Sequence, residues 1–300
     1  MPGLLDTTEQ TYRYYRHAVE NHWDPHDIDL TADREAVTEL DDLMFTNLRG
    51  SIAAFGAGEE SVAEDLAPLA VVLDDVQDEM FVTTQLYEEA KHADFFDRYW
   101  QTVVTPEEER RGMEETSPTD DQWFSDAYVE LFDRMEDSLN ELLVEDTAET
   151  RAKAYCHYHL TVEGILAQTA YYGLHRSYGP AETGLPTLPG LTAGLERIRG
   201  DEGRHVGFGM HKLRELVADG VDPQSLHATV NDLLGLVTAT TTHLMADVET
   251  GDEPGPGPDD LRSYAAEKHV ERMGQITDDA ASIPAVEDLV RVETDAAAGE

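Results

Sequence analysis

The chain has 300 residues and one cysteine, Cys156, so an internal disulfide framework and a cysteine-rich zinc finger are excluded. Its 63 acidic and 21 basic residues give a formal net charge of −42, which disfavours nucleic acids and anionic membrane surfaces as partners because like charges repel. Most of the basic residues are arginines, and an acidic, lysine-poor composition is typical of a halophilic protein in a salt-rich cytoplasm.

The N-terminus has no basic stretch followed by an apolar run, and no apolar stretch of about 18 residues lacks polar breaks. We therefore expect a cytoplasmic protein with no signal peptide and no membrane span. Apolar residues recur with helical periodicity nearly throughout, and no run alternates as a strand would. In chain order, the periodicity predicts helices over about 33–48, 57–76, 78–103, 119–144, 147–177, 191–219, 223–249 and 259–280.

Stretches rich in glycine and proline separate several of these helices, and the clearest covers residues 251–258. Residues 285–300 are expected to form a loose acidic tail. No segment has the composition of an interdomain linker, and no short repeat recurs at a fixed period. The sequence therefore predicts one all-α domain over residues 1–300.

The helix expected over 147–177 is unusually poor in charge. Between Ala154 and Arg176 its only charged side chain is Glu163, although a chain with 28% charged residues would place about six in such a window. We therefore expect this helix to be buried on nearly all sides. A buried carboxylate is costly unless a cation, a hydrogen-bond network or a raised pKa compensates it, so Glu163 is a candidate functional residue.

The helix expected over 78–103 carries Glu89 and His92 one turn apart on its apolar face. On the same helix, Glu88 and Lys91 are expected to point towards solvent. A single pair of this kind is most often an ion pair on a helix surface. Because this pair lies on the apolar face of its helix, we expect both side chains to be buried and to have a functional role.

The helix expected over 191–219 repeats this arrangement with Glu202 and His205, again on an apolar face. The helix expected over 57–76 places Glu59 on its apolar face. Glutamate is too frequent in this chain for the number of such pairs to carry weight, so the argument depends on their placement.

Four helices thus offer Glu, Glu-x-x-His, Glu and Glu-x-x-His in chain order, the pattern of dimetal-carboxylate four-helix bundles. Four carboxylates neutralise two divalent cations, and two imidazoles supply one nitrogen donor to each metal. Oxygen-rich ligation without sulfur suits iron and manganese rather than structural zinc. The sequence therefore predicts a dinuclear metal site in a core over about 57–219.

Four short segments make the chain resemble the ribonucleotide reductase small-subunit superfamily. They are Gly-Glu-Glu-Ser-Val at 58–62, Glu-Glu-Ala-Lys-His at 88–92, residues 158–164, and Asp-Glu-Gly-Arg-His at 201–205. The resemblance extends over roughly residues 20–250 and implies a ferritin-like helical bundle. More narrowly, the chain resembles the ligand-binding oxidases that are similar to these small subunits.

Two differences separate the chain from radical-forming reductase subunits. The position four residues after the first histidine, a radical tyrosine in those subunits, is Phe96 here, although some reductase subunits also carry phenylalanine there. Reductase subunits also end in a tail with a tyrosine that docks the large subunit, whereas residues 285–300 contain no aromatic residue.

The resemblance to the ligand-binding oxidases also implies a covalent feature. Members form an ether cross-link between a valine three residues after the first glutamate ligand and a tyrosine five residues before the third. These positions are Val62 and Tyr158 here. Without the cross-link, Val62 would be a packing residue and Tyr158 a buried hydroxyl bonded to a carboxylate.

By the same resemblance, a first metal would be held by Glu59, Glu89 and His92. A second would be held by Glu163, Glu202 and His205, with Glu89 and Glu202 able to bridge. Asp201 matches an aspartate that hydrogen-bonds the first histidine and orients it; otherwise it would be an acid on the helix surface.

The resemblance further implies one manganese and one iron, or two irons, a long-chain fatty acid or similar apolar ligand, and a homodimer. The leading hypothesis is a dimetal oxidase that activates dioxygen for two-electron oxidation of a C–H bond. The alternative is a ribonucleotide reductase small subunit that generates a radical. A ferritin-type iron store is disfavoured because ferritins are much shorter.

Overall fold

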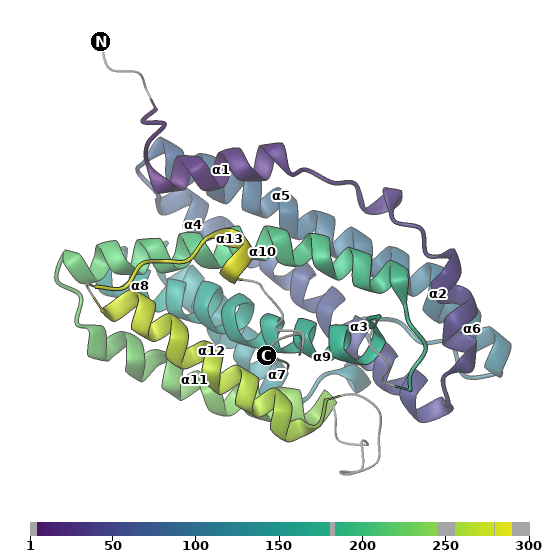
Figure 1. Cartoon of the computed structure of the whole chain (residues 1–300). Coiled ribbons are helices and arrows are strands. Elements are labelled where there is room, and N and C mark those ends of the chain that lie inside the picture. Colours follow the sequence, from purple (N-terminus) through teal and green to yellow (C-terminus); the bar gives the residue numbers. More distant parts are fainter. Residues whose placement is uncertain (1–4, 181–183, 245–255, 279, 290–300) are drawn as a thin grey trace, which may run out of the picture.

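The computed structural model describes residues 5–180, 184–244, 256–278 and 280–289, which fold into helices without any strand (Figure 1). The all-α prediction is therefore confirmed. Predicted residues 245–249 of the seventh helix and most of the acidic tail lie outside the described residues. The elements are α1 Gln10–Glu20, η1 Pro25–Asp27, α2 Thr31–Ala36, η2 Val37–Glu39, α3 Asp42–Asp65, α4 Ala67–Val72, α5 Val76–Tyr99, η3 Trp100–Val104, α6 Thr105–Arg111, η4 Asp121–Trp123, α7 Asp126–Glu141, α8 Ala148–Tyr155, η5 Cys156–Ala167, α9 Gln168–Tyr178, α10 Pro189–Ala218, α11 Pro223–Leu244, α12 Pro258–Thr277 and α13 Val286–Leu289.

The predicted bounds of the first two helices were wrong in the region of helix α3. A break was expected between 48 and 57, but α3 runs without interruption from Asp42 to Asp65. Its glycines serve close packing rather than a turn: a Cβ on Gly58 would lie 3.3 Å from both Phe132 and the Tyr128 hydroxyl. Helix α1 was not predicted, because its sequence carries many polar and aromatic residues and few aliphatic ones.

The charge-poor segment predicted as one helix is continuous, but its middle part, η5, is π-helical. Every residue over 154–166 is buried, which confirms the prediction that this helix is enclosed. The wider turn closes with the Thr161 hydroxyl donating to the carbonyl of Cys156, at 2.8 Å. Such π-helical turns are rare and occur frequently at functional sites.

Four elements, α3, α5, η5 and α10, form the centre of the bundle (Figure 1). Helix α3 packs along α5, and α10 packs against both α5 and η5. Helix α1 covers α5 and α10 on one side, while α11 and α12 cover η5 on the other. Each central element therefore has neighbours on more than one face.

The close contact between η5 and α10 depends on glycine. A Cβ on Gly209 of α10 would lie 2.2 Å from the Cβ of His159 on η5, which is closer than two carbon atoms can approach. Only glycine at this position therefore lets α10 pack so close to η5. Within η5, a Cβ on Gly164 would lie 2.7 Å from the carbonyl oxygen of His159. The start of α10 is held by Asp33, whose carboxylate accepts hydrogen bonds from the backbone N–H groups of Gly190 and Leu191.

Two apolar clusters fill the interior, one around Phe81 and Phe208 and the other around Phe45 and Phe95. The buried glutamates and histidines of the central elements lie between them in the chain: on α5, Glu89 falls between Phe81 and Phe95. The apolar clusters thus position a charged layer across the bundle. No described helix is both long enough and apolar enough to cross a membrane.

Candidate metal centre

The structure brings all six predicted metal ligands together at the centre of the bundle. They form two overlapping groups in which the candidate ligand atoms lie within 4.8 Å of one another. Two glutamates belong to both groups and so have the positions that bridging ligands need. One group comprises Glu59, Glu89, His92 and Glu202, and the other comprises Glu89, Glu163, Glu202 and His205.

The two histidines present the same ring nitrogen to the carboxylates. Nδ1 of His92 lies 3.4 Å from Glu59 and 3.3 Å from Glu89. Nδ1 of His205 lies 3.0 Å from Glu89 and 3.3 Å from Glu163. Both Nδ1 atoms are buried and have no hydrogen-bond partner. Each therefore has a lone pair or proton directed into the carboxylate cluster.

Several carboxylate oxygens also lack partners. The Oε2 atoms of Glu89, Glu163 and Glu202 are buried and make no hydrogen bond. Buried polar atoms in proteins are nearly always hydrogen-bonded, so five such atoms around one point need an explanation. Two divalent cations would satisfy all of them, and the set of carboxylate oxygens and imidazole nitrogens suits manganese and iron.

Burial disfavours the ionised form of the glutamates in the centre when no cations are bound. It raises the pKa of Glu59 and of Glu202 to about 8 and that of Glu163 to about 7. The carboxylates around His92 and His205 raise the pKa of both imidazoles well above the usual value, against the effect of burial. Protons thus take the place of cations in the metal-free centre.

The other ring nitrogen of His92 has its own carboxylate partner. Nε2 of His92 lies 3.0 Å from Oδ2 of Asp201, which also accepts a hydrogen bond from the indole of Trp23 at 2.8 Å. Lys91 forms an ion pair with the same oxygen at 2.7 Å. Against the effect of burial, the His92 imidazole, Arg204 and Lys91 hold the pKa of Asp201 well below its usual value, so Asp201 accepts the hydrogen bond that His92 donates through Nε2. This leaves Nδ1 free for a metal.

The histidine of helix α10 has a carboxylate partner in the same way. Nε2 of His205 lies 2.9 Å from Oε2 of Glu88, and Arg204 donates to Glu88 and to Asp201. Glu88 on α5 therefore orients the histidine of α10, while Asp201 on α10 orients His92 of α5. Carboxylates that hold a metal-binding histidine in one tautomer in this way typically raise its basicity.

These contacts correct one prediction. Glu88 and Lys91 were expected to face solvent, but they are only 2% and 6% exposed. Helices α1 and α10 cover that face of α5, so the charges are paired inside the protein. The sequence did hold a signal: the segments at 88–92 and 201–205 share the order acid, glutamate, small residue, base, histidine. Trp23 had no comparable signal, because it lies far from both segments in the chain.

The remaining predicted site residues lie beside the centre. The Tyr158 hydroxyl donates to Glu89 at 2.9 Å and accepts a hydrogen bond from Gln85 at 3.1 Å. Val62 is 4% exposed, and it belongs to the same apolar cluster as Tyr158. Phe96 is 1% exposed and stacks on the ring of Phe55 at 5.1 Å. No oxygen therefore stands at the position of a radical tyrosine.

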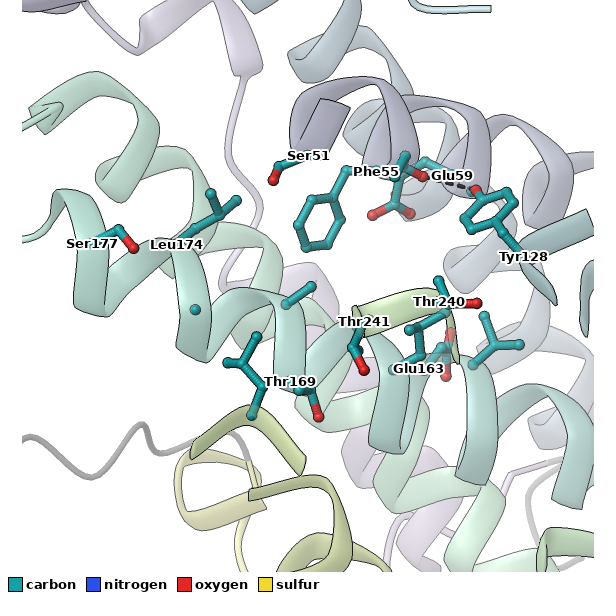
Figure 2. A pocket seen from close by; sticks show the side chains of 18 of the residues that line it. Ser51, Phe55, Glu59, Tyr128, Glu163, Thr169, Leu174, Ser177, Thr240 and Thr241 are labelled. Carbon is teal, nitrogen blue, oxygen red and sulfur yellow. Dashed lines mark hydrogen bonds between the residues drawn. The ribbon is translucent and has the colours of Figure 1, made fainter. Parts of the chain in front are cut away.

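A pocket with a largely apolar wall reaches the centre from one side (Figure 2). Glu59, Glu89, Glu163 and Glu202 contribute to its wall, so it opens directly onto the carboxylates. The rest of the wall comes mainly from α3, η5 and α9, with smaller contributions from α7, α11 and α12. Figure 2 shows Glu59, Tyr128 and Glu163 at one end and Ser51 and Ser177 towards the other. The pocket can admit an elongated molecule to the site.

Comparison with known proteins agrees with this geometry. The sequence model of the family described as ribonucleotide reductase, small chain, matches residues 7–253. One solved structure, a mutant of an R2-like ligand-binding oxidase with an anaerobically reconstituted Mn/Fe cofactor, is 27% identical with a TM-score of 0.80 and covers 91% of this chain and 95% of its own. A second mutant, with a non-activated Mn/Mn cofactor, has the same identity and coverage and a TM-score of 0.79. A third, with an aerobically reconstituted Mn/Fe cofactor, has a TM-score of 0.77 at the same identity and coverage.

Proposed function

The chain belongs to the family of ribonucleotide reductase small chains, and from this premise we propose that it is a dimetal-carboxylate oxidase that activates dioxygen. The proposal depends on one observation: a cluster of residues suited to bind metals forms the end of an apolar pocket. The buried carboxylate–histidine clusters suit two metals, and the same carboxylates form one end of a largely apolar pocket. A ligand in that pocket would lie against the metals.

In this proposal the centre holds one manganese and one iron, or two irons. The R2-like ligand-binding oxidases to which the chain is similar carry Mn/Fe or Mn/Mn. When bound, the metal pair supplies the redox chemistry that reduces dioxygen and withdraws two electrons from a C–H bond. The first site comprises Glu59, Glu89 and His92, and the second comprises Glu163, Glu202 and His205.

The protein's own residues have three tasks. Asp201 and Glu88 each accept a hydrogen bond from the Nε2–H of a histidine, which fixes the tautomer that leaves Nδ1 to the metal. Tyr158 holds one oxygen of Glu89 by a hydrogen bond and so orients a bridging carboxylate. The apolar wall of the pocket excludes water from the reacting atoms.

The ligand that we propose for the pocket is a long-chain fatty acid or a similar apolar molecule. The wall along α3 and α9 offers mostly apolar side chains, which suit an alkyl chain. A carboxylate head would lie at the end lined by Glu59 and Glu163, where metal ions would supply the positive charge that it requires. We also propose a homodimer and a halophilic setting, which a sedimentation measurement and a salt titration of folding can test.

The alternative function is that of a reductase small subunit. One observation favours it: a hydrogen-bonded line runs from His92 through Asp201 to Trp23, which is 8% exposed and so lies near the surface. An electron could leave the centre along this line. Phe96 at the radical position favours the oxidase.

The test is an oxidation that the protein performs on itself. Loading with manganese and iron without oxygen, followed by air, should join Cβ of Val62 to the phenolic oxygen of Tyr158. One C–H and one O–H bond break, one C–O bond forms, and the two electrons and two protons pass to dioxygen. Proteolysis and mass spectrometry should then find one linked peptide pair containing Val62 and Tyr158, lighter by two hydrogen atoms than the separate peptides.

The matched control is Tyr158→Phe, which keeps the ring and removes the reacting oxygen; it should bind metals and give no linked pair. Tyr171→Phe, another buried tyrosine in contact with Phe55, should leave the link intact. Bound metals and consumed oxygen without a link in the unsubstituted protein would refute membership of the oxidase subgroup and place the reductase alternative first.

A further inference from the structure

The Tyr158 hydroxyl has two hydrogen-bond partners, and one of them is the side-chain amide of Gln85 on α5. Gln85 is fully buried and precedes Glu89 by about one helical turn. Its Nε2 donates one hydrogen bond to the Tyr158 oxygen at 3.1 Å and another to Oε1 of Glu163 at 3.0 Å. Both hydrogens of the amide are thereby used, and each is directed at a residue of the predicted site.

Two neighbours determine which way the amide of Gln85 is turned. Its oxygen lies 3.4 Å from Nε2 of His159 on η5. Burial holds the pKa of His159 well below its usual value, so the ring is neutral and its one proton, placed on Nε2, is donated to the amide oxygen. The opposite orientation would set the amide oxygen against the carboxylate of Glu163, and two acceptors facing each other in the interior repel. The NH₂ group therefore faces Tyr158 and Glu163.

An amide hydrogen directed at the phenol oxygen decides where the phenol's own hydrogen points. The Tyr158 hydroxyl has a single hydrogen, which cannot lie on the side where the oxygen accepts from Gln85. It is directed instead at Oε1 of Glu89, 2.9 Å away. Glu163 is the other carboxylate near the phenol: burial raises its pKa to about 7, and His205 and the Tyr158 hydroxyl counter part of that rise. The amide thus selects Glu89 as the acceptor.

This orientation matters because the phenol oxygen is a reacting atom of the proposed self-oxidation. When the oxygen joins Cβ of Val62, it must also lose its proton. Val62 and Tyr158 are buried in one apolar cluster, so the carboxylate already bonded to the hydroxyl is the base within hydrogen-bond reach of that proton.

We propose that Gln85 is a positioning residue for this reaction: it holds the Tyr158 phenol with its hydrogen on Glu89, so that the proton leaves on that side when the ether forms. The inference rests on the proposed function, since it assumes that Val62 and Tyr158 are joined. One C–H and one O–H bond break, one C–O bond forms, and two electrons and two protons pass to dioxygen, the phenolic proton by way of Glu89. Gln85 acts on the reaction only through another side chain.

The first measurement needs no metal. Metal-free protein labelled with ¹³C at Cζ of its 12 tyrosines gives one carbon signal per phenol, and Tyr158→Phe identifies the Tyr158 signal by its loss. Gln85→Met keeps an unbranched side chain and removes the amide, so the Tyr158 signal should move because the phenol loses a donor. Gln168→Met is the matched control and should leave the signal in place, because the Gln168 amide is also buried and forms no hydrogen bond with the described residues.

The second measurement is the rate at which the link forms. Each variant is loaded anaerobically with manganese and iron and exposed to air, and the linked peptide pair is followed by mass spectrometry relative to bound metal. The rate should fall about tenfold in Gln85→Met, the effect of one hydrogen bond, and stay unchanged in Gln168→Met. Gln85→Leu, which removes the same amide with a different side-chain shape, should behave like Gln85→Met. Metal content and circular dichroism confirm that the variants are folded and loaded.

Each outcome has a distinct meaning. A Tyr158 signal that does not move in Gln85→Met, or a link that forms there at the unsubstituted rate, would overturn the positioning role of Gln85 and leave the oxidase standing. A link that never forms in the unsubstituted protein, with both metals bound and oxygen consumed, would overturn the oxidase and this inference with it.

Discussion

The metal centre and the charged network beside it are both buried clusters of acids and bases, but they differ in how their charge is balanced. In the network, the carboxylates of Glu88 and Asp201 face the cations of Lys91 and Arg204, so two negative charges meet two positive ones. In the centre, four glutamates surround two imidazoles, and no described lysine or arginine forms an ion pair with any of the four.

The difference shows which cluster is complete in the protein alone. The charges of the network are balanced by the chain itself, and its carboxylates accept hydrogen bonds from Nε2 of the two histidines. The centre leaves Nδ1 atoms and carboxylate oxygens without partners, so it needs about two divalent cations to reach balance. The charged network supports the structure, whereas the centre is suited to bind metal. Residues of the two clusters are nevertheless interspersed along the chain at 88–92 and 201–205.

The largest effect should follow from removing a ligand of the centre. Glu163→Ala and Glu202→Ala should each lose most of their bound metal, because each metal has few protein ligands and Glu202 belongs to both groups. Elemental analysis after dialysis measures the metal content. Glu60→Ala, which removes an exposed acid next to Glu59, is the control and should bind two metals. Full occupancy of both sites in both ligand variants would disprove the assignment.

A second substitution should break the balanced network. Arg204→Met keeps much of the side chain's volume but leaves Glu88 and Asp201 short of a cation in the interior, where a lone charge is costly. The free energy of unfolding, from urea titration in high salt, should fall by about 3–5 kcal/mol.

The control for that substitution is Arg134→Met, which removes an arginine whose side chain is 38% exposed and paired with Glu130 and Asp232. Surface ion pairs contribute about 1 kcal/mol or less, so this variant should be close to the unsubstituted protein. If the two variants lose the same stability, the network is not the balanced support that the contacts indicate.

A smaller effect concerns pH in the metal-free protein. Glu59, Glu163 and Glu202 have pKa values of about 7 to 8 in the folded state, above the ordinary value of 4.5. Folding therefore favours their protonated forms, and this contribution is lost as the pH rises from about 5 to about 8. The raised pKa values of His92 and His205 act in the same direction, because their stabilising charge is lost as pH rises through the folded-state pKa.

Two further groups should not disturb this window. Glu89 and Asp201 have lowered pKa values, so their contribution is present above the ordinary value and lost only in stronger acid. The melting temperature of the metal-free protein should thus fall by several degrees between pH 5 and pH 8, and added manganese and iron should flatten the profile because metals hold the carboxylates ionised. A metal-free protein with a flat profile would show that these carboxylates are not crowded in the interior.

Local pattern was enough to predict much of the site. The helical periodicity of the apolar residues alone placed Glu59, Glu89 and Glu202 on apolar faces. The scarcity of charged residues around Glu163 predicted an enclosed helix. These inferences were possible because the spacing of apolar residues along a helix shows which of its faces is buried. A polar residue among apolar neighbours one turn away is visible without knowledge of the partner helix.

Other features depended on contacts between distant segments. The sequence placed Glu88 and Lys91 on a solvent face, and the structure buries both, because α1 and α10 cover that side of α5. A charged residue on a helix gives the same local pattern whether it faces water or a partner charge on another helix. Only the packing of α10 against α5 decided between the two.

The same reasoning applies to the continuous helix α3. A break was expected before residue 57, but the glycines at 56 and 58 lie inside α3 and pack against the side chains of Phe96, Phe132 and Tyr128. The sequence by itself determined the helices' apolar faces and the residues of the metal centre, because both follow from spacing along one helix. The tertiary structure alone decided which charges are paired, where the pocket opens and which of its groups remain unsatisfied, because these depend on neighbours that are remote in the chain.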